Sequence, residues 1–191
     1  LGTTTNGVYC LNIDKKELTH PIQKGNITSF YQDSESELWI GSWEEGLFRV
    51  KADGTIENFK YNAKDPHSLS SNFVRACCED NLGNIWIGTF NGLNRYNKIT
   101  GLFQNHTAND TQADGLTHSS IWCIVKDNQG TLWLGTYFGG VNYFNPEYEI
   151  YTRYSYSSNE KKGLSNPVVG RTIEDKDGNL WIGTEGGGLN Y

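Results

Sequence analysis

The stretch Ile85-Trp86-Ile87-Gly88-Thr89 decides the fold, because close copies of it recur along the whole chain. The Trp residues of the four copies lie 47, 47 and 48 residues apart. The other copies are Trp39-Ile40-Gly41-Ser42, Trp133-Leu134-Gly135-Thr136 and Trp181-Ile182-Gly183-Thr184. A fixed period of this size indicates either the blades of a propeller or the turns of a solenoid. The content of the repeat decides between them.

Each repeat contains four strand-like segments, which we call strands A to D and describe for the second copy. Strand A is the mainly apolar run 74–80, which ends in Asp80, and a polar turn with Gly83 follows. The Trp lies on strand B, strand C begins at Gly92, and strand D is the more polar run 101–106. Asp or Asn followed by Gly is typical of a tight turn between antiparallel strands. Because no helical periodicity is sustained, the repeat predicts an all-β protein, a β-propeller built of four-stranded antiparallel blades.

The alignment of the repeats also predicts the blade boundaries. The chain starts inside a repeat, since Gly7-Val8-Tyr9 matches Gly46-Leu47-Phe48 on strand C, and it stops after strand C of the last repeat. The two ends therefore overlap, whereas the ends of a closed ring complement each other to complete one blade. We expect a piece of a larger propeller rather than a closed ring of four blades. The predicted units are a partial blade at 1–24, blades at 25–63, 64–108 and 109–157, and a partial blade at 158–191.

The composition agrees with a turn-rich β protein and limits the function. The 191 residues include 22 Gly, 4 Pro and 13% aromatic residues, as a β domain with many turns requires. The net charge of -6, with no basic run, argues against nucleic-acid binding. The sequence has no signal peptide and no apolar stretch long enough to span a bilayer. Cys77 and Cys78 replace residues that are apolar or aromatic in the other blades, so we expect buried free thiols there. Because no Cys or Cys/His spacing suggests zinc, we expect neither a metal nor another cofactor.

The last repeat carries the fullest set of motifs. It contains Gly163-Leu164-Ser165, Glu174-Asp175, Leu180-Trp181-Ile182-Gly183-Thr184 and Gly187-Gly188-Leu189-Asn190-Tyr191. This pattern resembles the two-component regulator propeller repeat, and the resemblance covers essentially the whole chain. The first full repeat departs from the pattern, because its turn Ser34-Glu35-Ser36-Glu37 has no Gly, which leaves the tightness of that hairpin open.

The resemblance implies where such a chain acts. Propellers of this family typically have seven blades and form the periplasmic sensor region of a histidine kinase anchored in the inner membrane, often a hybrid kinase that detects glycan fragments. The implied partners are an oligosaccharide ligand and the other blades and domains of the parent sensor. The resemblance also implies that this region is not an enzyme, since kinase activity would lie in other domains. An open array of blades exposes the faces of its end blades, which favours a homodimer.

Residues that break the repeat on one face form the candidate site. We call this face the rim; it consists of the turns between strands B and C and the loops from strand D into strand A. Three consecutive blades carry an aromatic residue directly after the Gly-Thr or Gly-Ser of strand B, and early strand A adds a Trp and two Arg. Aromatic rings stack on sugar rings, and an Arg pair recognises a carboxylate or sulfate of an acidic saccharide. The candidate ligand-binding residues are Trp43, Phe90, Tyr137, Phe138, Arg75, Trp122 and Arg171.

Other interpretations stay open at this point. The rim rings could pack on the D–A loops, with the arginines paired to Glu44, Glu45 or Glu185, or they could contact another subunit or domain. In the latter case the chain is a protein-interaction platform without a small ligand. An enzyme would require converging acid, base or metal groups, which no spacing singles out. His20 and His67 share a repeat position, but one His per blade makes no metal cluster, so we expect no catalytic residue and no metal ligand.

Overall fold

The computed structural model describes residues 1–108, 115–146, 150–158 and 163–191. Within these ranges all regular structure is β, and no helix long and apolar enough to cross a membrane is found there. The strands are β1 (Val8–Asn12), β2 (Glu17–Ile22), β3 (Ile27–Gln32), β4 (Leu38–Ser42), β5 (Leu47–Val50), β6 (Ile56–Phe59), β7 (Val74–Glu79), β8 (Ile85–Thr89), β9 (Gly92–Asn97), β10 (Leu102–His106), β11 (Ile121–Lys126), β12 (Leu132–Thr136), β13 (Val141–Asn145), β14 (Ile150–Tyr154), β15 (Val169–Glu174), β16 (Leu180–Thr184) and β17 (Gly188–Asn190).

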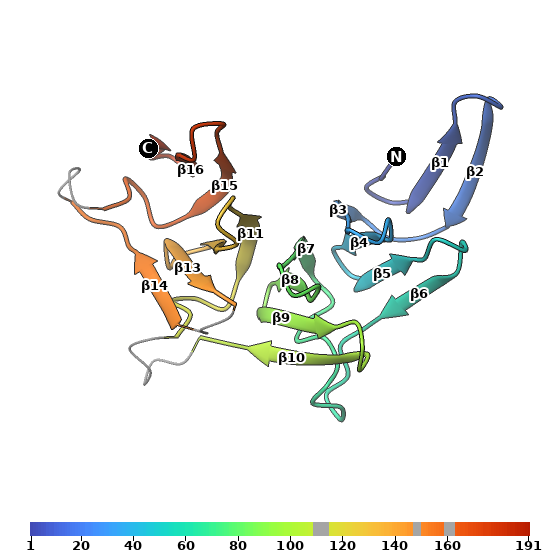
Figure 1. The fold of residues 1–191 in the computed structure, drawn as a ribbon, viewed down its shortest axis with the longest axis horizontal. Coiled ribbons are helices and arrows are strands. Elements are labelled where there is room, and N and C mark those ends of the chain that lie inside the picture. The colour runs from blue at the N-terminus through green and yellow to red at the C-terminus, as the bar shows by residue number, and fades with distance from the viewer. Residues whose placement is uncertain (109–114, 147–149, 159–162) are drawn as a thin grey trace.

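The strands form five antiparallel sheets. Three of them, β3–β6, β7–β10 and β11–β14, have four strands in chain order, whereas β1–β2 and β15–β17 have two and three. Figure 1 shows the sheets fanning out in an arc, with the last strands β6, β10 and β14 at the outer edge and the smaller sheets at the two ends. The first strands β3, β7, β11 and β15 pack against one another along the inner side. The prediction of an all-β propeller with four-stranded antiparallel blades is confirmed.

Each motif Trp is tied to the preceding A–B turn by a hydrogen bond. Trp86 Nε1 donates to Asp80 Oδ2 over 2.7 Å, and the other oxygen of Asp80 accepts from the backbone N–H groups of Leu82 and Asn84, each over 2.9 Å. The same indole bond, over 2.8 Å, joins Trp39 to Asp33, Trp133 to Asp127 and Trp181 to Asp175. The Asp that ends strand A therefore orders the turn and orients the ring at the same time.

The A–B turn of the β3–β6 blade is as tight as the others although it has no Gly. Ser36 has a φ of 65°, close to the 79°, 85° and 83° of Gly83, Gly130 and Gly178 in the other blades. Its N–H donates to the carbonyl of Asp33 over 3.0 Å, which closes the turn. A residue with a Cβ costs about 1–2 kcal/mol in this left-handed conformation. The blade therefore keeps the hairpin geometry at a cost in stability.

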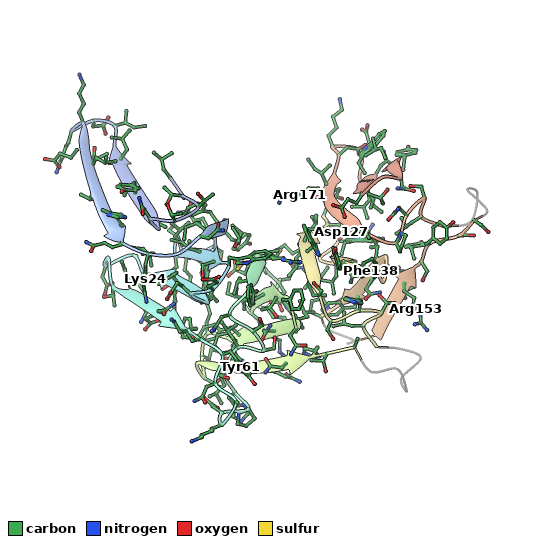
Figure 2. The ribbon with its side chains drawn as sticks, turned by 180° about the vertical axis from the view of Figure 1, so that it is seen from behind. Lys24, Tyr61, Asp127, Phe138, Arg153 and Arg171 are labelled. Carbon is green, nitrogen blue, oxygen red and sulfur yellow. The ribbon has the colours of Figure 1, made fainter. Side chains whose placement is uncertain are left out.

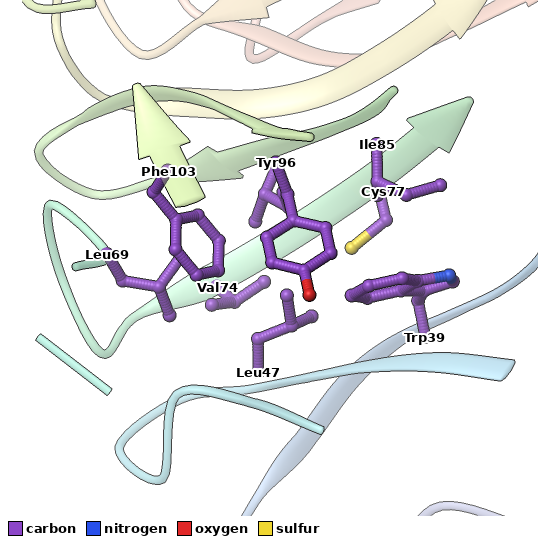
Figure 3. Close-up of a cluster of buried hydrophobic side chains, with 9 residues drawn as sticks. Trp39, Leu47, Leu69, Val74, Cys77, Ile85, Tyr96 and Phe103 are labelled. Atoms are coloured by element: carbon purple, nitrogen blue, oxygen red, sulfur yellow. The ribbon is translucent and has the colours of Figure 1, made fainter. Parts of the chain in front are cut away.

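The hydrophobic core lies between the blades rather than inside them. Successive side chains of strand B point to opposite faces of the sheet, so the Trp faces the following blade and the next residue faces the preceding one. Trp86 packs edge-on against Phe144 of the β11–β14 blade, with ring centroids 4.9 Å apart, whereas Ile87 joins the cluster around Trp39. Figure 3 shows this second cluster, which fills the space between the β3–β6 and β7–β10 blades. Trp39 and Trp86 are fully buried, so the motif Trp is a packing residue in these two blades.

The motif Gly allows adjacent blades to approach closely. A Cβ on Gly88 would lie 2.7 Å from Cγ2 of Ile121, the first residue of β11. A Cβ on Gly135 would lie 2.6 Å from Cγ1 of Val169 at the start of β15. Carbon atoms of different residues do not approach this closely in a packed core. Any side chain at the Gly position would therefore push the following blade away.

A buried ionic network joins the β3–β6 and β7–β10 blades on the side of the A–B turns. The Lys98 side chain is 11% exposed, and its Nζ lies 2.8 Å from Asp33 Oδ2 and 3.0 Å from Glu79 Oε1. Glu79 also accepts hydrogen bonds from the backbone N–H and the hydroxyl of Ser34 in the preceding blade. Burial by itself raises the pKa of Asp33, but hydrogen bonds from Lys98 and Trp39 outweigh it and hold that pKa below its usual value. Asp33 and Lys98 therefore stay ionised at neutral pH, and the network links the two blades.

Candidate ligand-binding rim

The last residue of each strand B motif shapes the B–C turn. Thr89 Oγ1 donates to the carbonyl of Gly92 over 2.9 Å. The next residue then returns toward strand A, because the N–H of Phe90 donates over 3.0 Å to the carbonyl of Phe73, directly before β7. The same backbone bond is made by Trp43, Tyr137 and Glu185 in the other blades. These four rim positions are therefore equivalent, and the first three carry aromatic rings.

The loop from strand D into strand A is fixed by an Asn on strand C. Asn94 Oδ1 accepts from the N–H of Ser70 over 2.8 Å, and Asn94 itself is fully buried. Asn142 and Asn190 hold the N–H groups of Thr117 and Ser165 in the same way, over 3.0 and 2.9 Å. The Asn of the Gly-Leu-Asn motif thus binds the backbone of the Gly-Leu-Ser motif, which explains why the two motifs occur together. This bond anchors the rim loops to the sheets.

A β-bulge at the second residue of strand A places Arg75 and Trp122 at equivalent positions in the β7–β10 and β11–β14 blades. The pairing of β7 with β8 is irregular between Val74 and Ala76, so Arg75 is the extra residue. Trp122 occupies the same place in β11, where pairing is irregular between Ile121 and Cys123. A bulge redirects the side chain of the extra residue. Arg75 and Trp122 are therefore structurally equivalent residues of adjacent blades.

The Arg75 guanidinium lies among three aromatic rings from three successive blades. Its Cζ is 4.1 Å from the ring centroid of Trp122, 5.1 Å from that of Trp43 and 5.6 Å from that of Phe90. Trp122 in turn stacks on Tyr137, with centroids 5.5 Å apart and planes 12° from parallel. We call these five residues the rim cluster. Cation–π contacts of this kind stabilise a desolvated guanidinium, so the cluster is a coherent unit.

Phe138 extends the rim cluster, whereas Arg171 does not belong to it. The Phe138 ring meets that of Tyr137 at 4.2 Å and is 56% exposed. Arg171 pairs with Gly183 as Ala76 pairs with Gly88, one residue beyond the bulge, and its side chain is exposed. Figure 2 shows Arg171 and Phe138 at separate places, and no described contact links Arg171 to the cluster. The alignment placed Arg171 near the bulge position, but one residue decides the direction of a side chain on a strand.

The charge of Arg75 is not neutralised by any carboxylate among the described residues. Among the described residues, its guanidinium donates a hydrogen bond from Nη1 to the hydroxyl of Ser120, over 3.3 Å. Glu45, a suggested partner, is engaged by Lys24 and Lys60 at 2.7 and 2.8 Å. Burial lowers the pKa of the Arg75 guanidinium, which nevertheless stays charged at neutral pH. The rim cluster therefore contains a cation without a counterion in the described part of the chain.

Three residues near the cluster escape sequence reasoning. Phe73 packs edge-on against Trp43 at 5.3 Å, Ser120 accepts from Arg75, and His118 meets the Phe138 ring at 6.0 Å. Phe73 and Ser120 share the repeat position before strand A, whose carbonyl receives the rim N–H. That shared position is the signal that could have found them.

Four segments of the chain match the model of the two-component regulator propeller: residues 21–44, 68–91, 115–138 and 163–186. The chain belongs to the two-component regulator propeller family. Each matched segment runs from the D–A loop through strands A and B into the B–C turn. The family pattern therefore includes all the backbone elements that build the rim.

Solved structures that resemble this two-component regulator propeller include two from B. thetaiotaomicron. The extracellular domain of a hybrid two-component system has 25% identity and a TM-score of 0.74, over 98% of this chain and 24% of that one. The extracellular domain of a system described as one-component has 22% identity and a TM-score of 0.75, over 98% and 25%. The present chain spans about a quarter of the length of these domains. Virginiamycin B lyase from Staphylococcus aureus shares the fold, with 15% identity and a TM-score of 0.69 over 97% and 62%. None of the curated proteins compared with the chain matches it.

A hollow of this two-component regulator propeller lies away from the rim, on the side of the A–B turns. It has a volume of about 470 Å³, and its lining includes Asp127, Trp133 and Glu174. In the two preceding blade interfaces the corresponding Trp contacts an aromatic residue of the next strand C, Tyr96 or Phe144. Tyr191 corresponds to Tyr143 rather than to Phe144, because Asn190 pairs with Ile182 as Asn142 pairs with Leu134, and it packs on Trp181 at 4.7 Å. The hollow lies between the β11–β14 and β15–β17 blades, and the rim remains the candidate site. Within the described ranges, no three His, Cys, Asp or Glu residues gather as metal ligands would.

Proposed function

We propose that the chain is a ligand-sensing propeller module of a two-component signalling protein, lying in the periplasm and anchored through its parent protein to the inner membrane. Its family and its likeness to the extracellular domains of two-component systems support this assignment. The observation that carries the ligand-binding role is the rim cluster, in which three successive blades present aromatic rings around one cation. Catalysis would belong to other domains of the parent protein.

The proposed ligand is a glycan fragment. Trp43 and Phe90 are 37% and 54% exposed, so part of each ring is accessible to a sugar. Rigid rings bind with little loss of conformational entropy, and their flat faces suit the axial C–H groups of a sugar. A ligand that touches three blades would signal by binding one arrangement of domains or protomers more tightly than another.

A protein-interaction platform is the alternative function. Phe90 and Phe138 are each more than half exposed on the same rim, and exposed apolar surface of this kind also mediates contacts between subunits or domains. In that case the rim would bind a protein surface, and substitution of its rings would change assembly without affecting saccharide binding.

Calorimetric titration of the full chain with a panel of neutral and acidic oligosaccharides tests the proposal. We expect saturable binding to one glycan class, weakened about tenfold or more by Trp43→Ala, since stacking contacts are worth about 1 kcal/mol beyond burial. Ile99→Ala is the matched control, because Ile99 is 96% exposed in a C–D turn on the opposite face. A folded protein that binds no saccharide, and whose sedimentation changes with Trp43→Ala, would support the platform instead.

A further inference from the structure

The arginine of the rim cluster is paired differently from Arg49, which packs on the motif Trp39. Arg49 lies 5.3 Å from the Trp39 ring, but its Nη2 is 2.6 Å from Glu37 and its Nη1 is 3.4 Å from Glu57. Arg75 has comparable ring contacts and no carboxylate among the described residues. Buried charges are normally paired. The charge of Arg49 is therefore neutralised by carboxylates, whereas the charge of Arg75 is not neutralised by any described carboxylate.

Two further donors of the cluster have no acceptor among the described residues. The Nε of Arg75 and the Nε1 of Trp122 are both buried and unpartnered. A buried donor without an acceptor costs about 1–3 kcal/mol, and such groups are rare in folded proteins. They lie in one place, because the guanidinium is stacked over the same Trp122 ring. The cluster thus has a surplus of donors and of positive charge.

Part of the rim cluster is open to solvent. Phe90, a member of the cluster, and Phe138, which packs on Tyr137, are 54% and 56% exposed. Exposed rings make few contacts that fix them, and side chains of this kind change rotamer on the nanosecond timescale. An incoming group can therefore approach the cluster from the side of these two rings. The rings of Trp122 and Tyr137 are less exposed and stack on each other, so they form the stable floor.

We infer that the rim cluster selects an acidic saccharide, with Arg75 binding its carboxylate or sulfate group and the rings of Trp43 and Tyr137 holding the sugar. The inference rests on the proposed glycan-sensing function and adds the chemical class of the ligand. A planar guanidinium offers two parallel N–H donors that match the spacing of oxyanion oxygens. Its faces are occupied by aromatic rings, which leaves the donor edge for the ligand. An anionic group supplies both missing features, the counterion and the acceptors.

Calorimetric titration with three probes tests this selectivity: trigalacturonic acid, neutral galactotriose and a sulfated galactose disaccharide. We expect the full chain to bind one of the acidic probes at least tenfold more tightly than galactotriose, since a charge-assisted bond is worth about a factor of ten or more. The carboxylate and sulfate probes distinguish the two sources of negative charge. Affinity for the acidic probe should fall with added salt, whereas that for galactotriose should not.

The decisive variant is Arg75→Met, which keeps an apolar stem among the rings and removes the charge. We expect it to lower affinity for the acidic probe to the level of galactotriose, with a loss at least tenfold larger than any loss of galactotriose binding. Arg75→Lys should retain part of the preference, because charge remains but the two parallel donors do not. Arg171→Met is the matched control and should change neither affinity, since Arg171 has no described contact with the cluster. Far-UV circular dichroism checks the fold of each variant.

The outcomes separate the inference from the function on which it rests. Equal binding of neutral and acidic probes, or equal loss of both in Arg75→Met, would overturn the selectivity and leave glycan sensing intact. Absence of binding to every saccharide in a folded protein would overturn both.

Discussion

Gly88 faces Ile121 across the interface between the β7–β10 and β11–β14 blades, and a Cβ on Gly88 would lie 2.7 Å from the Cγ2 methyl of Ile121. The contact repeats at each interface and explains why the motif needs Gly directly after its apolar residue. Because the surrounding core is closely packed, neither blade can yield without losing contacts elsewhere.

Gly88→Ala is therefore expected to destabilise the protein by about 1–3 kcal/mol, the usual cost of overpacking. Urea unfolding followed by Trp fluorescence measures the change. Gly183→Ala is the control, because a Cβ there would meet its nearest atom, the carbonyl oxygen of Arg171, at an ordinary 3.6 Å. Ile121→Ala removes the methyl that would clash. The double variant should therefore lose less stability than the sum of the losses in the two single variants. Strict additivity would contradict the contact.

Ser36→Gly should stabilise the protein. Ser36 adopts a φ of 65° that Gly occupies in the other A–B turns, and relief of this conformation outweighs the greater entropy of Gly in the unfolded chain. The expected gain is about 0.5–1 kcal/mol, measured by thermal unfolding. Ser36→Ala keeps the Cβ and should bring no gain, so an equal effect of both substitutions would show that φ is not the cause.

Asp80→Ala should destabilise the protein by about 2–4 kcal/mol, because it leaves the buried indole N–H of Trp86 and two turn N–H groups without their acceptor. The readout is the urea midpoint together with the NMR resonance of the Trp86 indole proton, which should lose its hydrogen-bonded shift. Trp86→Phe removes the donor as well. Combined with Asp80→Ala, it should add less than its single effect.

Lys98→Met should weaken the interface between the β3–β6 and β7–β10 blades by about 2–3 kcal/mol near neutral pH, because it leaves two buried carboxylates without their cation. The measurement is urea unfolding at a series of pH values.

The pH dependence of this effect has a defined sign. The folded-state pKa of Asp33 lies below its unfolded value, so the stabilisation is present above about pH 4 and is lost as the pH falls through the folded pKa. Wild-type stability should decline below pH 4, and the decline should be shallower in Lys98→Met, where Lys98 no longer lowers the pKa. A decline of the same steepness in both proteins would exclude Asp33 as the titrating group.

Much of the fold could be predicted because four copies of the repeat carry the same pattern of strands and turns. The Trp spacing, the Asp turn and the Gly before strand C define the strands of each blade without long-range information. Ser36 shows the limit of this reasoning, since the turn closes without the Gly that usually marks it. The interfaces on both sides of that blade determine its geometry and override the local preference.

The candidate site could be predicted only in part. Trp43, Phe90 and Tyr137 share one repeat position, and the structure gives them equivalent backbone bonds. The stacking of Arg75 on Trp122 depends on a bulge and on the distance between two blades. Neither can be predicted from the sequence of a single repeat. Arg171 differs from Arg75 by one place in the repeat and lies outside the rim cluster for that reason. Whether any of these residues binds a ligand stays a prediction.

The Gly contact between neighbouring blades also bears on how such genes change in length. The β7–β10 blade has the motif Gly, Gly88, on the face toward the next blade and a β-branched strand A residue, Val74, on the face toward the preceding blade. A tandem duplication of one repeat unit of 47 residues therefore inserts a blade that already fits both of its neighbours. Copying and deletion within the gene can lengthen or shorten the array. Point substitutions at the exposed rim change the rim surface without disturbing the Gly contacts between blades.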